Sequence, residues 1–109
     1  MSIAAYIDEP VNEKEDNFYI PISTEKFFKS YWKPGCEALD LQWVTLFDVG
    51  VDITKEYVSD VIMELEQLQT WSEQNLSDEQ VKHIKERIEL LKKHLPSIFE
   101  RDDVSLFIG

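Results

Sequence analysis

The stretch VSDVIMELEQLQTWSEQNLSDEQVKHIKERIELLKKHL, residues 58–95, decides the architecture because it holds two helical patterns joined by a short link. Apolar residues recur at a spacing of three or four in both halves, as one buried helix face requires. Ser77 and Gln80 open the second half as a capping box. A short link favours antiparallel packing, so the stretch predicts an αα-hairpin. The expected buried stripes are Val58, Val61, Ile62, Leu65, Leu68 and Trp71, then Val81, Ile84, Ile88, Leu91 and Leu95.

Segments rich in β-branched and aromatic residues flank the hairpin and predict strands. They are residues 2–8 (SIAAYID), 18–22 (FYIPI), 41–47 (LQWVTLF) and 104–108 (VSLFI). LQWVTLF is apolar on both alternating faces, which is typical of a strand in the middle of a covered sheet. The turn DVGVD follows it, around Gly50, and Thr54 is the expected N-cap of the next helix.

One more helix is expected between FYIPI and LQWVTLF, with an interruption near Lys33 because Pro34 and Gly35 disfavour a regular helix. The predicted order is therefore β-β-α-β-α-α-β. This order favours a small α/β fold with a mixed sheet of three to four strands, a βαβ unit through the first helix, and the αα-hairpin. An α+β arrangement is the alternative.

Length and composition predict one domain over residues 1–109, in which residues 1–17 form a strand or arm followed by an exposed acidic loop. The chain has neither a basic, apolar leader at its start nor an apolar run of roughly 18 residues, so we expect a cytoplasmic protein away from the membrane. Cys36 is the only cysteine, which excludes an intrachain disulfide and a cysteine-based zinc framework. No cofactor is expected.

The charge is strongly negative, with 22 acidic and 11 basic residues and a net charge of -11. Such a charge opposes binding to nucleic acid and to anionic membrane surfaces. The acidity is concentrated in residues 40–79, where Lys55 is the only basic residue. A concentrated negative field attracts basic proteins and speeds their association.

Five acidic residues in this region are the predicted contacts for such a partner: Asp48, Asp52, Glu56, Asp60 and Glu64. The last three stand at i, i+4 and i+8 of the predicted helix, where like charges destabilise it by about 0.2–0.5 kcal/mol per pair. We therefore expect either a docking face for a basic partner or a solvated face without further role.

Residues with catalytic potential are sparse, and an enzyme is not expected. Asp48 and Asp52 bracket Gly50 and offer oxygen ligands for Mg²⁺ or Ca²⁺, so a metal-dependent enzyme is one alternative. His83 and His94 lie about three helical turns apart, too far to share a metal. A structural or adaptor subunit is the other alternative, a possible homo-oligomer that would associate through Tyr31, Trp32 and Trp71.

In size, acidity, mixed helices and strands, and a final strand, the chain resembles the small bacterial inhibitors that neutralise nuclease toxins, such as the barstar family. Composition and layout carry this resemblance, and no aligned motif does. It implies an immunity-type inhibitor that places carboxylates where the phosphates of a nuclease substrate would lie. The expected partner is a basic protein.

Overall fold

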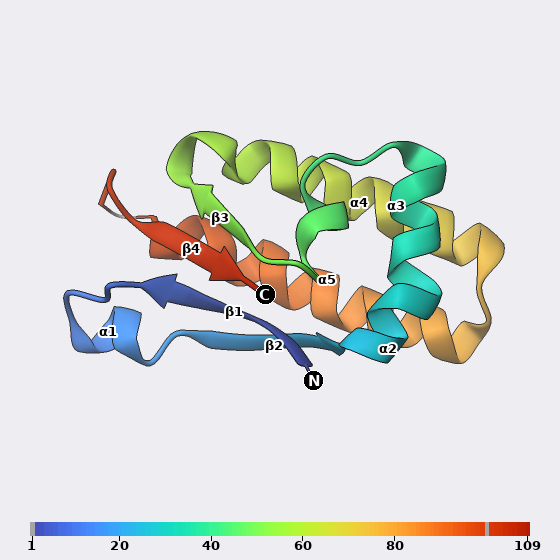
Figure 1. Ribbon diagram of the computed structural model, residues 1–109, viewed down its shortest axis with the longest axis horizontal. Coiled ribbons are helices and arrows are strands. Elements are labelled where there is room, and N and C mark those ends of the chain that lie inside the picture. The colour runs from blue at the N-terminus through green and yellow to red at the C-terminus, as the bar shows by residue number, and fades with distance from the viewer. Residues whose placement is uncertain (1, 100) are drawn as a thin grey trace.

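The computed structural model describes residues 2–99 and 101–109, and Figure 1 shows four strands lying against long helices. The strands are β1 (Ser2–Asp8), β2 (Tyr19–Thr24), β3 (Val51–Thr54) and β4 (Ser105–Ile108). The α-helices are α1 (Glu13–Asp16), α2 (Glu25–Phe27), α3 (Lys33–Leu39), α4 (Val58–Asn75) and α5 (Asp78–Ile98). Three other helical segments are η1 (Phe28–Trp32, π-helical), η2 (Val44–Leu46) and η3 (Lys55–Tyr57), the last two 3₁₀-helical.

The strands form one antiparallel sheet in the order β2-β1-β4-β3, and the order of strands and helices along the chain roughly matches the prediction. The predicted βαβ unit is wrong. β2 and β3 occupy opposite edges of the sheet, and each neighbouring pair is antiparallel, so no parallel crossover joins them. The α+β alternative describes this topology better, because strands from the two ends of the chain pair with each other.

The αα-hairpin is confirmed. The Ser77 hydroxyl accepts from the Gln80 amide at 3.4 Å, and the Gln80 side chain accepts from the Ser77 amide at 3.2 Å, completing the capping box. In Figure 1, α5 passes behind β4, α4 runs along the upper side of the molecule, and both helices bury their apolar stripes. From Pro96 alone we would expect α5 to end at this residue, because an interior proline disfavours a helix. The helix instead continues past Pro96 to Ile98.

The predicted strand at residues 41–47 is wrong, because this segment folds into a loop containing η2. Leu41, Val44 and Phe47 are its buried residues. They are spaced by three, which suits a 3₁₀ turn, and the alternation that indicated a strand is not used. The third strand instead lies at Val51–Thr54, just after Gly50, whose φ of 101° makes the predicted turn.

The expected interruption of the first helix takes the form of η1, a π-helical segment between α2 and α3. Pro34 lies at the start of α3, where the wider preceding turn accommodates its missing N–H. Gly35 lets α3 approach α4 closely, since a Cβ here would lie 2.5 Å from the Leu68 side chain and 2.6 Å from that of Trp71.

The two faces of the sheet differ in burial. Ile7, Ile53 and Leu106 lie on the face against the helices and are at most 5% exposed. The alternating residues face solvent, where Tyr6 is 40% and Tyr19 is 60% exposed. We call this second surface the open face of the sheet. Within residues 2–99 and 101–109, neither long helix has a segment apolar enough to cross a bilayer.

Candidate protein-binding surface

Glu64, one of the five predicted contacts, is internal and serves the fold. Its side chain is buried and accepts hydrogen bonds from three backbone N–H groups at the start of η2. The bonds run from Gln42 at 2.9 Å, Trp43 at 2.9 Å and Val44 at 3.0 Å. A carboxylate at the start of a helical turn satisfies donors that have no partner within the helix. The prediction that Glu64 faces solvent is wrong.

The side chain of Asp48 is also largely buried. Its side chain is 6% exposed and lies 3.3 Å from the Lys33 Nζ, which also donates to the Thr45 carbonyl at 2.6 Å. Asp52 lies on the open face of the sheet instead. The two aspartates therefore do not converge as the predicted pair of metal ligands, and among the described residues no three His, Cys, Asp or Glu side chains form a metal-sized cluster.

The other three predicted contacts, Asp52, Glu56 and Asp60, are exposed. They lie on β3, on η3 and in the first turn of α4 respectively. This region is one end of the sheet, where β1 and β3 end and β4 begins (Figure 1). A shallow hollow there is lined by Thr54, Lys55, Glu56 and Asp102.

Antiparallel pairing brings carboxylates from distant parts of the chain to this end of the sheet. Asp8 pairs with Ser105 on β4, and Ser105 pairs with Thr54 on β3. We use the name "acidic end" for the surface formed by Asp8, Glu9, Asp52, Glu56, Asp60, Asp102 and Asp103. Sequence reasoning missed the members outside residues 40–79, because their proximity depends on the pairing of the first and last strands.

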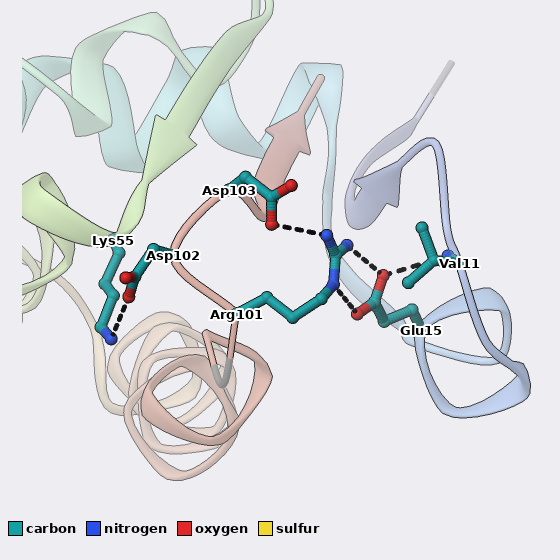
Figure 2. A network of polar contacts seen from close by, with 6 residues as sticks. All are labelled: Val11, Glu15, Lys55, Arg101, Asp102 and Asp103. Atoms are coloured by element: carbon teal, nitrogen blue, oxygen red, sulfur yellow. Dashed lines mark hydrogen bonds and ion pairs between the residues drawn. The ribbon is translucent and has the colours of Figure 1, made fainter.

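The two basic residues Lys55 and Arg101 at the acidic end form ion pairs with neighbouring carboxylates, as Figure 2 shows. Lys55 binds Asp102 at 2.8 Å, and this hydrogen bond lowers the pKa of the carboxyl group. Arg101 contacts Glu15 through two nitrogens, at 2.8 and 3.0 Å, and Asp103 through a third at 2.6 Å. The Arg101 hydrogen bonds likewise lower the pKa of Glu15. These pairs fasten α1 and the segment before β4 to the rest of the acidic end.

Asp8 and Asp52 differ from these pairs because two carboxyl groups face each other. Partial burial, a hydrogen bond to Asp52 and repulsion from Asp52 and Glu9 raise the pKa of Asp8 from 3.8 to about 6. A hydrogen bond between two carboxyl groups requires a proton, and Asp8 carries it at mildly acidic pH because its pKa is about 6.

Replacement of Asp8 by Asn should therefore stabilise the protein at neutral pH. The native state holds the extra proton between about pH 4 and pH 6, so the contribution of Asp8 to stability is lost as the pH rises through this window. An asparagine amide can donate a hydrogen bond to Asp52 without taking up a proton from solution. We expect a gain of about 1 kcal/mol at pH 7, after allowance for solvent screening, and little gain at pH 4. Urea unfolding of both proteins at several pH values measures this difference, and a gain independent of pH would contradict it.

An aromatic row lies beside this carboxyl pair on the open face of the sheet. Tyr19, Tyr6, Phe107 and Asp52 are successive cross-strand partners on β2, β1, β4 and β3. The rings of Tyr6 and Phe107 are 5.4 Å apart and tilted by 50°. A Cβ at Gly109 would lie 2.6 Å from the Phe107 ring and one at Gly50 would lie 2.9 Å away, so these glycines let the ring pack on bare backbone.

The remaining predicted candidates lie away from this surface. Trp32 is fully buried, so it cannot serve as an exposed aromatic contact, while Tyr31 and Trp71 are half-buried and pack against the core. Cys36 is 1% exposed, and burial raises the pKa of its thiol to about 12, which keeps it protonated. Burial also lowers the pKa of His83, whose ring lies 4.3 Å from that of Phe27.

No known family, curated protein or solved structure matches this chain significantly.

Proposed function

We propose that this protein is a small cytoplasmic module that binds a basic protein through the acidic end, most concretely an immunity-type inhibitor of a nuclease toxin. The observation that carries the proposal is the convergence of carboxylates from both ends of the chain on one surface. Asp52, Glu56 and Asp60 are exposed there. Asp48 and Glu64 are excluded as contacts, because Asp48 pairs with Lys33 and Glu64 accepts backbone hydrogen bonds inside the fold.

Inhibition would be steric and electrostatic. A nuclease binds phosphates with basic side chains, and carboxylates on a rigid sheet end can occupy the same positions. Acidic residues grouped on one side steer a basic partner toward that side, so the association rate falls as salt screens the field. The basic residues Lys55 and Arg101 do not oppose this steering strongly, because neighbouring carboxylates already neutralise them.

Charge reversal at the acidic end tests the proposal. The variant Glu56→Lys with Asp60→Lys should lose a basic protein captured by the wild type from native lysate at low salt. The control Glu73→Lys with Glu79→Lys has the same net charge, because it changes two exposed glutamates outside the acidic end, and it should retain that protein. We expect the association rate to fall by about tenfold or more in the first variant.

The captured protein must also be a nuclease whose activity the wild type inhibits. Equal capture by both variants, or capture that does not depend on salt, would place the interface elsewhere. If the wild type binds the captured protein tightly but inhibits none of its activities, the binding module stands and the inhibitor function is wrong.

A further inference from the structure

The open face of the sheet carries aromatic rings and carboxyl groups at matched positions, and it has no covering layer among the described residues. Tyr6 and Phe107 are direct cross-strand partners, and Asp52 is the partner of Phe107 on the other side. Asp8 is two residues from Tyr6 on the same strand, so its side chain lies on the same face. Four side chains from three strands thus form one continuous surface.

We propose that this surface binds an arginine side chain of the partner protein, stacked on Tyr6 and Phe107 and held by Asp8 and Asp52. The inference rests on the proposed function, since it names the chemistry of the partner. A guanidinium group has a flat face that stacks on aromatic rings and a row of N–H donors that matches carboxylates. A lysine ammonium group lacks this planar fork.

Charge complementarity selects this occupant over the alternatives. Apart from burial, the described residues that shift the pKa of Asp8 are Asp52, Glu9 and Ser105, and none of these three is cationic. Asp8 therefore keeps a proton where a cation bound between Asp8 and Asp52 could interact with both carboxyl groups. A second copy of this chain would bring its own carboxylates to a surface that is already negative, and the phosphates of nucleic acid would meet the same repulsion.

The geometry holds the stacking surface in place before binding. Phe107 packs on the bare backbone of Gly50 and Gly109 and against Tyr6, so one side of its ring is fixed by the sheet. The rigid strands place Asp52 next to this ring without any rearrangement. A preformed site loses less conformational freedom when the ligand binds.

Binding of arginine through these carboxyl groups should release the proton of Asp8. Arginine and the proton compete for the same oxygens, so the affinity should be about tenfold lower at pH 5 than at pH 7. This dependence follows from Asp8, whose neutral form persists to about pH 6 because burial and repulsion from Asp52 and Glu9 oppose its ionisation, while the hydrogen bond from Ser105 on β4 favours the ionised form. A purely electrostatic contact with the rest of the acidic end would show a much smaller change.

The test is an NMR titration of the full chain with N-acetyl-arginine amide, with the citrulline amide as the neutral control of equal shape. We expect arginine to shift the ring signals of Tyr6 and Phe107 and the carboxyl signals of Asp8 and Asp52, and citrulline to shift none of them. The lysine amide should bind more weakly. Equal shifts with citrulline, or arginine binding with no pH dependence, would overturn the proposal.

Variants separate the parts of this site. Asp8→Asn should weaken arginine binding and remove its pH dependence, whereas Glu73→Gln, at an exposed position on α4 outside the acidic end, should leave both unchanged. Phe107→Leu should weaken binding by about two- to fivefold, the loss expected for one exposed cation–π contact. Tyr6→Leu provides the same measurement if Phe107→Leu does not fold, as judged by circular dichroism.

The same variants distinguish the failure of this site from the failure of the inhibitor function. If a captured basic partner binds Asp8→Asn and Tyr6→Leu as tightly as wild type, the arginine site is wrong and the inhibitor function stands. If the arginine amide binds as described and no basic protein is captured, the site stands and the inhibitor function is wrong.

Discussion

Glu64→Ala is expected to destabilise the protein by about 3–4 kcal/mol, a large part of the total stability of a small domain. The substitution removes the acceptor for the amides of Gln42, Trp43 and Val44. Val44 is fully buried, so its N–H group has no access to water when the carboxylate is lost. Urea unfolding gives the change in free energy.

The matched control for this prediction is Glu73→Ala on the same helix. Glu73 is exposed, and alanine is a good helix former, so the change should be within about 0.5 kcal/mol. The loss of stability in Glu64→Gln should fall between those of Glu64→Ala and Glu73→Ala. The glutamine amide oxygen can accept from Trp43 and Val44, but its NH₂ group would face the Gln42 N–H, and two donors repel. Hydrogen exchange should show loss of protection at residues 43 and 44 in Glu64→Ala. Equal stability of Glu64→Ala and Glu73→Ala would contradict the assigned role.

Lys33→Met is expected to destabilise the protein by about 3 kcal/mol, because it leaves Asp48 without its cation in a largely buried position. It also removes the donor to the Thr45 carbonyl. Methionine retains much of the apolar stem of lysine, so the loss measures the charge and not the packing.

Addition of Asp48→Asn to Lys33→Met should recover part of this loss, since a neutral amide needs no counter-ion. Asp48→Asn alone should be less harmful than Lys33→Met, because the Lys33 side chain is 28% exposed and can be partly solvated. A double-mutant cycle in urea gives the coupling between the two residues. Additive effects of the two substitutions would contradict the ion pair.

The sequence predicted the αα-hairpin because helical periodicity, a capping box and a short link all agreed over residues 58–95. It failed at residues 41–47, where the same apolar residues fit a period of two and a period of three. The side chain that decides between them is Glu64, about twenty residues further along the chain. A single-sequence pattern has no means of including such a distant partner.

The candidate surface was predicted in part, and helix geometry explains the error at Glu64. Each step of four residues advances about 40° around an α-helix, so Glu64 lies about 40° further around α4 than Asp60, toward the buried stripe. Val61, Glu64, Leu65 and Leu68 have the spacing of one buried face, a signal present in the sequence. The contributions of Asp8 and Asp102 were missed because they depend on strand pairing across most of the chain.

The position of β4 between β1 and β3 makes the sheet depend on residues that are synthesised after the other three strands and both long helices. Until β4 has left the ribosome, β1 can pair only with β2, and β3 has no neighbour in the sheet. The αα-hairpin is made of local contacts and can form earlier. Asp8 and Asp52 come together across β4, so the acidic end and the open face are completed only after the residues of both long helices have been synthesised.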